Sequence, residues 1–150
     1  LRLGTLYGLG LPHKGSALLS RYLPLFRKQE TIKAIADEYR SFFCTIDLAR
    51  VVECLVNEPS KEKLFHLSSG EKESYYSFLT TVGNVFGFSL DSIQAISGSK
   101  FAGQLAESGG ARGSDLSLSC SKFSSQYKIN FDTLSENLFL YKTRLRFGEW

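Results

Sequence analysis

Arg40 is a charged residue at the junction between a predicted strand and a predicted helix. It comes just before the apolar run Phe42–Phe43, and Asp47 follows in the first turn of the helix. A guanidinium in this position can hold an anion, because its planar N–H groups form paired hydrogen bonds with phosphate or carboxylate oxygens. On the residue alone, a surface charge or an ion pair with Asp37 or Glu38 is the simpler interpretation.

The remaining reactive side chains have simple structural explanations. The three cysteines, Cys44, Cys54 and Cys120, are widely spaced. The sequence has no close cluster of Cys and His residues, so we expect no zinc site. We therefore expect reduced thiols and a cytoplasmic protein. Cys44 has bulky apolar neighbours, which predict an inert, buried thiol. Asp47 is best explained as an acid at the positive end of a helix dipole, and His66 as a packed, hydrogen-bonded histidine.

Length and composition indicate a single domain with a substantial core. The chain has 150 residues, 43% of them apolar, and a net charge of +3. This mild charge, with acids and bases well mixed, argues against nucleic acid as a partner. No apolar run has the length of a membrane span, and Leu1–Leu11 lacks the pattern of a signal peptide. The chain contains no methionine, so we expect a fragment or a processed piece of a longer protein.

Strands and helices alternate along the chain, which predicts an α/β or mixed α+β fold. We place strands at 1–6, 31–36, 63–69, 92–97 and 116–119, and we expect Phe42 and Phe43 to belong to a further extended, buried segment. Helices are predicted at 16–23, 46–56 and 74–86, with a helical turn at 121–126 and a last helix after 133. The segment 98–113 is rich in glycine and serine, and we expect it to be a loop within one region that spans 1–150.

Particular residues are expected to begin and end these helices. Pro24 should end or kink the first helix, and Thr45 should cap the second by accepting an N–H of its first turn. Ser74 and Gly87 should begin and end the third, and the pair Thr133–Glu136 forms a capping box for the last. The second helix should carry one apolar stripe made of Leu48, Val51, Val52, Leu55 and Val56.

Three glycines near the start have the spacing of a dinucleotide-binding loop, namely Gly4, Gly8 and Gly10. Such a loop must run directly into a helix whose N-terminus holds the pyrophosphate. Pro12 and His13 interrupt the path to the next predicted helix. We therefore expect a glycine-rich turn after a strand at this position, and no cofactor site.

Four segments, taken in order, resemble the C-terminal half of an extended short-chain dehydrogenase/reductase, in the group of nucleotide-sugar epimerases, dehydratases and reductases. The strand that ends in Tyr7-Gly8 resembles the strand after the family's catalytic helix. The stretch 40–49, Arg-Ser-Phe-Phe-Cys-Thr-Ile-Asp-Leu-Ala, resembles its arginine, aromatic run and Asp-Leu-Ala. Segments 63–87 and 112–115, the latter followed by Ser121-Lys122, resemble parts of its substrate-binding portion and its end.

The resemblance implies the substrate-binding half of a Rossmann-type enzyme that acts on a nucleotide-diphosphate sugar. It implies that Arg40 and Arg112 contact the diphosphate, and that Asp115 orients the second arginine or reaches the ribose. Tyr7 would lie near the start of the substrate pocket. NAD or NADP would be bound by the other half of a full-length parent and not by this chain alone. The parent is expected to form a homodimer, with no nucleic acid or membrane as a partner.

Departures from the family pattern leave two functions open. The family's catalytic pair, Tyr-x-x-x-Lys, occurs nowhere in the sequence, so we expect no catalysis by the chain alone. It is either the substrate-binding portion of an oxidoreductase or epimerase, or a non-catalytic regulatory or binding protein of the same family. Segments 37–39 and 65–69 favour a branch similar to dTDP-4-dehydrorhamnose reductase, whereas Arg40 favours the epimerases.

Overall fold

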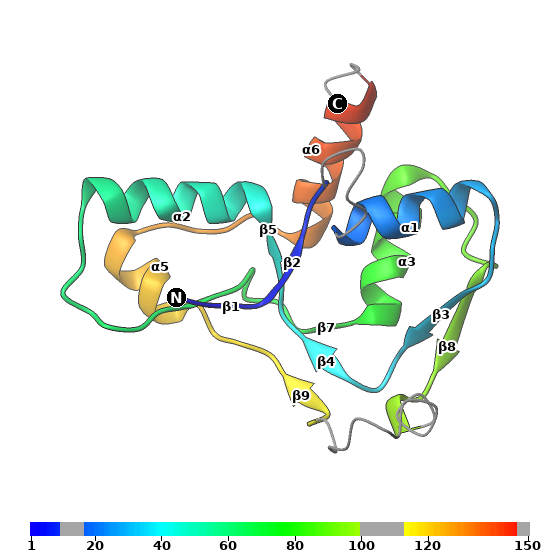
Figure 1. Cartoon of the computed structure of the whole chain (residues 1–150), viewed down its shortest axis with the longest axis horizontal. Helices are drawn as coiled ribbons and strands as arrows, with labels where there is room; N and C mark the ends of the chain where they lie inside the picture. Colours follow the sequence, from blue (N-terminus) through cyan, green and yellow to red (C-terminus); the bar gives the residue numbers. More distant parts are fainter. Residues whose placement is uncertain (10–16, 100–112, 147–150) are drawn as a thin grey trace.

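Figure 1 shows the computed structural model of the chain, which describes residues 1–9, 17–99 and 113–146. Its strands are β1 (Arg2–Leu3), β2 (Thr5–Tyr7), β3 (Ile32–Ile35), β4 (Tyr39–Arg40), β5 (Phe42–Cys44), β6 (His66–Leu67), β7 (Glu73–Ser74), β8 (Ile93–Ile96) and β9 (Asp115–Leu116). Its helices are α1 (Leu18–Arg27), α2 (Thr45–Asn57), α3 (Tyr75–Phe86), α5 (Ser121–Tyr127) and α6 (Leu134–Arg146). Gly10, Pro12, His13, Arg112 and most of the predicted loop 98–113 lie outside the described residues.

The strands pair mostly in parallel and join segments that are distant in the sequence. β1 pairs with β6, β2 with β5, and β3 with β8, each in parallel. β4 is the middle strand of a three-stranded sheet, where it runs antiparallel to β7 and parallel to β9. Parallel pairs need long crossover connections, which the helices of this chain supply. The predicted α/β character is confirmed.

β5 lies between two hydrophobic clusters. Phe42 and Phe43 are neighbours on this strand, so the pleat turns their side chains to opposite faces. Phe42 stacks on Phe78, with ring centroids 4.3 Å apart, in the larger cluster, to which α1, α3 and α6 contribute. Phe43 meets Phe131 edge-on at 5.1 Å in the smaller cluster, to which α2 and α5 contribute. Figure 1 shows α2 and α5 on one side of β5, and α1 and α3 on the other.

The predicted ends of α3 and the predicted start of α6 are confirmed. Ser74 Oγ accepts the N–H of Ser77 at 3.0 Å, and Gly87 ends α3 with a left-handed φ of 79°. The capping box before α6 is formed in both directions. The Glu136 N–H donates to Thr133 Oγ1 at 3.3 Å, and the Thr133 N–H donates to Glu136 Oε2 at 2.8 Å. Local sequence therefore fixes these helix ends.

Of the two predicted effects of Pro24, an end or a kink of the first helix, the end is wrong, because α1 continues to Arg27. Leu23 and Phe26, on either side of the proline, are both buried in the larger cluster. The proline carbonyl accepts the N–H of Lys28 at 3.1 Å. Burial of these two apolar side chains offsets the unfavourable placement of a proline inside a helix.

The prediction that Thr45 caps α2 is also wrong. The N-cap residue is Cys44, and no side chain caps the helix there. Thr45 Oγ1 lies 2.7 Å from the hydroxyl of Tyr141 on α6, so the threonine hydroxyl joins two helices. Asp47 does lie in the first turn of α2, as predicted.

The apolar stripe of α2 is narrower than predicted. Val51 is fully buried, and Leu48 and Leu55 pack partly against the smaller cluster. Val52 and Val56 are 49% and 72% exposed. They follow the buried positions by one residue, and the 100° turn of the helix rotates them out of the cluster.

The predicted strands at 31–36 and 92–97 are confirmed as β3 and β8, which pair over four residues each. The strand predicted at 63–69 shortens to β6, His66–Leu67. The strand predicted at 116–119 begins one residue earlier and is also short, as β9. These strand ends are set by pairing partners elsewhere in the chain, which a single segment does not specify.

Gly4 and Gly8 allow close packing, as expected for a structural role. A Cβ atom on Gly4 would lie 2.5 Å from the carbonyl oxygen of Ser41, and one on Gly8 would lie 2.3 Å from Thr45 Oγ1. Any larger residue would push the parallel strands β2 and β5 apart, or displace the start of α2. Both glycines are therefore explained by the fold.

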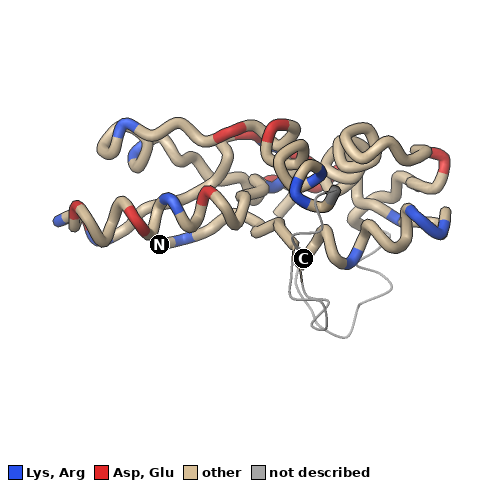
Figure 2. The backbone as a smooth tube through the Cα atoms, turned by 90° about the horizontal axis from the view of Figure 1, so that it is seen from above, with Lys and Arg blue, Asp and Glu red and all other residues tan. Residues whose placement is uncertain are grey.

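Charged residues are spread over the molecule. Figure 2 shows acidic and basic positions interspersed along the described backbone, in keeping with the mild net charge of +3. Among the described helices, none combines the length and the apolar composition that crossing a bilayer requires. The same described residues contain no group of three or more His, Cys, Asp and Glu side chains suited to a metal ion.

Candidate anion-binding site

Arg40 projects from β4, the middle strand of the three-stranded sheet. Its Nη2 donates to Glu38 Oε2 at 3.2 Å, and its central carbon lies 5.7 Å from the centre of the Tyr75 ring. The Arg40 side chain is only 19% exposed. Its Nε–H is buried and has no acceptor among the described residues. The guanidinium is thus partly neutralised, and one donor still lacks an oxygen acceptor.

The sheet register sets the surroundings of Arg40. Glu73 on β7 is its partner across the antiparallel pair, and Glu38 precedes it by two residues, so alternation places both acids on its face. The pKa of Glu73 is raised, first by burial and then by the neighbouring charge of Glu71. Of the two acids that the sequence offered Arg40 as partners, Glu38 is the one bonded to it.

Gly98 has no side chain, which leaves room for the carboxylate of Glu38. A Cβ atom at residue 98 would fall 2.2 Å from Glu38 Oε1. The neighbouring Asp37 holds this segment in place, because it accepts the Gly98 N–H at 2.7 Å and the hydroxyl of Ser97. These bonds lower the pKa of Asp37, the one from Ser97 most. The end of β8 is therefore tied to the acidic segment that precedes Arg40.

A second charged group lies on the opposite face of the same sheet. Tyr39 is the register partner of Asp115 on β9, and Lys72 reaches both residues. The Lys72 ammonium makes an ion pair with Asp115 and lies 4.7 Å from the centre of the Tyr39 ring. This ion pair and a hydrogen bond from Ser117 hold the pKa of Asp115 well below its usual range. Sequence reasoning missed Lys72, whose pairing with Asp115 depends on strands that meet only in the fold.

The structure brings Asp115 and Arg40 onto neighbouring strands but turns their side chains to opposite faces. In the register of β4 and β9, Arg40 is opposite Leu116 and not Asp115. Arg112 lies outside the described residues, so its predicted role stays a prediction. The described chain resumes at Gly113, and the Ser114 carbonyl accepts the N–H of Tyr39 at 2.7 Å. The segment that follows Arg112 therefore joins the strand that carries Arg40.

Tyr7 lies away from this sheet, in the larger core. It is the register partner of Cys44 at the end of β5, and its ring packs edge-on against Phe78 at 5.6 Å. Its hydroxyl is buried and has no hydrogen-bond partner among the described residues. Burial strongly raises the pKa of Tyr7, and it also raises the pKa of the Cys44 thiol, as expected for an inert cysteine. Tyr7 is a core residue with one unsatisfied polar atom.

Asp47 is buried and bonded on both sides. It accepts from Asn137 Nδ2 and from Arg50 Nη1, each at 2.9 Å. Burial nevertheless raises the pKa of Asp47. The sequence indicated the helix-start role of this acid but not the contact with Asn137, which comes from α6. His66 is half-buried, and the predicted hydrogen bond is absent at its Nε2, which is buried and has no partner among the described residues.

Comparison with known proteins identifies the fold. No family model and no curated protein matches the sequence. The dTDP-4-dehydrorhamnose reductase of Bacillus anthracis, solved with NADP, matches with a TM-score of 0.78 and 17% identity over 95% of this chain and 47% of that one. The reductase of the same name from Clostridium acetobutylicum matches with a TM-score of 0.76 and 20% identity over 97% and 48% of the two chains.

This is the fold of extended short-chain dehydrogenase/reductases. The UDP-glucuronic acid 4-epimerase of Bacillus cereus, solved with UDP-glucuronic acid and NAD, matches with a TM-score of 0.64 and 15% identity over 96% of this chain and 44% of that one. The chain therefore spans about half the length of each of these three enzymes. The resemblance drawn from four sequence segments is confirmed for the fold. The roles of Arg40, Asp115 and Tyr7 stay predictions.

Proposed function

We propose that this chain is the substrate-binding portion of an NAD(P)-dependent oxidoreductase or epimerase that modifies a nucleotide-diphosphate sugar. The observation that carries the proposal is the Arg40 guanidinium, which is largely buried and has an Nε–H donor with no acceptor among the described residues. A diphosphate is a dense anion that guanidinium groups bind through paired hydrogen bonds. The matching B. cereus epimerase was solved with a nucleotide-diphosphate sugar bound, which supports this choice of ligand.

In this proposal the diphosphate takes its place beside Arg40 and competes with Glu38 for the guanidinium. Arg112 supplies a second guanidinium from the segment that leads into β9, and Asp115 orients that segment through its bonds to Lys72 and Ser117. The nucleotide is remote from the reacting sugar carbon. Its binding energy serves to hold the sugar in the orientation that the reaction needs.

Hydride transfer would be the chemistry of the nicotinamide cofactor. Close packing against Ser41 and Thr45 accounts for Gly4 and Gly8 without a bound cofactor. We therefore assign cofactor binding to the half of the fold that this chain does not cover. The residues of this chain bind and orient the substrate.

Titration calorimetry with UDP, dTDP, GDP and CMP tests the proposal. We expect at least one nucleotide to bind, and Arg40→Ala to weaken its binding by roughly tenfold or more, because a hydrogen bond to a charged group contributes about 1.5–3 kcal/mol. Arg112→Ala should weaken it as well. Arg27→Ala, at an exposed arginine in the last turn of α1, is the matched control and should leave affinity unchanged. If no nucleotide binds, or Arg40→Ala binds as tightly as the unmodified chain, the proposal fails.

The alternative is a non-catalytic regulatory or binding protein with the same fold. Both functions predict that the purified chain lacks turnover, since the sequence contains no Tyr-x-x-x-Lys pair. Steady reduction of a nucleotide-linked 4-keto sugar by residues 1–150 and NADPH would contradict both. The two functions differ in the encoding gene: an intact Tyr-x-x-x-Lys pair ahead of Leu1 favours the enzyme, and its lack there favours the regulatory protein.

A further inference from the structure

Helix α6 is apolar on two faces. Its inner face carries Leu134, Leu138 and Tyr141, which are buried in the larger core. Its outer face carries Phe139 and Leu140, which are 63% and 43% exposed. A surface helix normally buries a single apolar stripe. Two adjacent large apolar side chains on the outer face therefore need a separate explanation.

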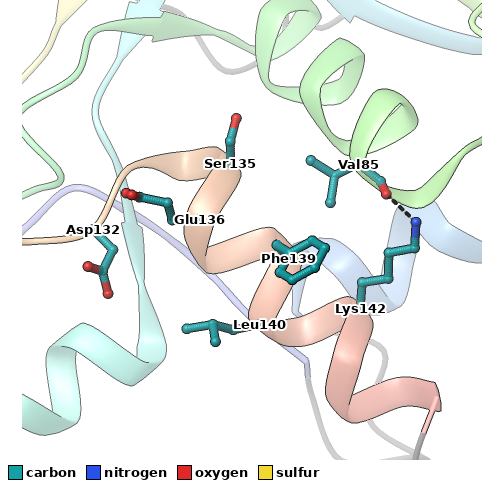
Figure 3. Close-up of a pocket in the computed structure, with 7 residues that line it drawn as sticks. All are labelled: Val85, Asp132, Ser135, Glu136, Phe139, Leu140 and Lys142. Carbon is teal, nitrogen blue, oxygen red and sulfur yellow. Dashed lines mark hydrogen bonds between the residues drawn. The ribbon is translucent and has the colours of Figure 1, made fainter.

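The outer face forms one wall of an open groove of about 600 Å³. Figure 3 shows Phe139 on α6 near Val85 at the end of α3, with Ser135 and Glu136 at the start of α6. Lys142 Nζ donates to the Val85 carbonyl at 2.7 Å, which fixes the groove at the end of α3. The groove is bounded by α6 and the end of α3, and its apolar centre is open to solvent.

The charges on α6 are divided between its two ends. Glu136 lies in the first turn, and Arg144 lies near the end and is exposed. Glu136 Oε2 accepts two hydrogen bonds from Thr133. Among the described residues, no donor forms a hydrogen bond with Glu136 Oε1. The position midway between Glu136 and Arg144 is Leu140, beside Phe139. The outer face is thus acidic at one end, apolar in the middle and basic at the other.

A surface with this order of charges is complementary to itself when it is reversed. In a two-fold interface each contact occurs twice, so an antiparallel pair of α6 helices centred on Phe139 and Leu140 brings Glu136 opposite Arg144 of the second copy at both ends. Helical periodicity puts Glu136, Leu140 and Arg144 one turn apart along the same side. The apolar centres cover each other in the same arrangement.

We propose that this outer face of α6 associates with the same face of a second copy of the chain, antiparallel and about a two-fold axis. One helix and the rim of one groove give an interface at the small end, below about 1,200 Å² in total. The dimer is therefore weak, and its population depends on protein concentration. This proposal does not depend on the nucleotide-binding function.

Sedimentation equilibrium over a hundredfold range of protein concentration tests the proposal. We expect a reversible monomer–dimer equilibrium in the unmodified chain. Arg144→Glu should raise the dissociation constant by about tenfold or more, because it sets like charges against each other at both ends. The double variant Arg144→Glu/Glu136→Lys should recover much of the lost affinity. Phe139→Ser should abolish the dimer.

Arg27→Glu is the matched control, since Arg27 is also an exposed arginine in the last turn of a helix. It should leave the equilibrium unchanged. Circular dichroism checks that each variant is folded, and Glu136→Gln separates charge from capping, because glutamine still completes a capping box. A chain that stays monomeric at all concentrations overturns the proposal. So does a dimer that Arg144→Glu and Phe139→Ser leave intact, which would place the contact on another face.

Discussion

Arg40 Nη2 and Glu38 Oε2 lie 3.2 Å apart, with both side chains less than one-fifth exposed. The backbone of Gly98 packs closely against the Glu38 carboxylate of this ion pair. Glu38 therefore occupies part of the donor set that an incoming anion needs. It keeps the guanidinium in place when no ligand is bound, and it opposes a second negative charge at the same group.

Replacing Glu38 by glutamine should tighten nucleotide binding. Glutamine keeps the size of the side chain and removes the competing charge, so we expect roughly fivefold higher affinity, equivalent to about 1 kcal/mol. Calorimetric titration with the nucleotide that binds the unmodified chain measures the effect. In an Arg40→Ala background the same substitution should have little effect. Weaker binding by Glu38→Gln alone would show that its charge positions Arg40 more than it competes.

Gly4→Ala should destabilise the fold. The added Cβ would lie 2.5 Å from the Ser41 carbonyl oxygen, a backbone atom that can move only if β2 and β5 separate. We expect a loss of about 1–3 kcal/mol in the free energy of unfolding, measured by urea denaturation. Gly113→Ala is the control, because the closest atom to its added Cβ is a Leu116 side-chain carbon at 3.5 Å. Equal stability of the two variants would contradict the packing explanation.

Two buried tyrosines should respond differently to loss of their hydroxyl groups. Tyr141→Phe removes the partner of Thr45 Oγ1 and should cost about 1 kcal/mol in the free energy of unfolding. Tyr7→Phe removes a buried hydroxyl with no partner among the described residues, so it should be neutral or stabilising by about 1 kcal/mol. Thermal and urea unfolding compare the variants. If Tyr7→Phe is stable but binds nucleotide sugar less well, the hydroxyl contacts substrate, as the family resemblance implied.

Asp47 should make stability depend on pH in an unusual direction for an acid. Burial raises its pKa above the ordinary value of 3.8, despite the bonds from Asn137 and Arg50. The folded state therefore holds a proton on Asp47 more readily than the unfolded state does. The contribution of Asp47 to the free energy of unfolding is therefore fully present at low pH, and it is lost as the pH rises through the raised pKa of the folded state.

The variant Asp47→Asn isolates this effect, because its side chain does not titrate. Acids with lowered pKa values, such as Asp37 and Asp115, act in the opposite direction and are common to both proteins. The free energy of unfolding of the unmodified chain, minus that of Asp47→Asn, should therefore fall as pH rises from about 4. Urea denaturation at several pH values gives this difference. A difference that stays constant or grows with pH would contradict the direction stated for Asp47.

Local signals in the sequence are sufficient to predict many elements. The caps at Ser74 and Thr133 are predicted correctly, because each motif acts within one turn of its helix. The buried aromatic run of β5 is also predicted, since hydrophobic residues in a short extended segment pack on both faces. The spacing of Gly4 and Gly8 matches a cofactor loop, and in the structure both glycines have a packing role, against Ser41 and Thr45.

Most helical, extended and buried segments follow from local sequence, because periodicity and capping act over a few neighbouring residues. Tertiary packing sets which groups those segments bring together. Thr45 bonds to Tyr141, a residue 96 positions away, and so does not cap its own helix. Arg40 and Asp115 lie on neighbouring strands but face opposite sides, because a strand register sets which side chains share a face. That register is fixed by packing between segments far apart in the chain, which no local pattern records.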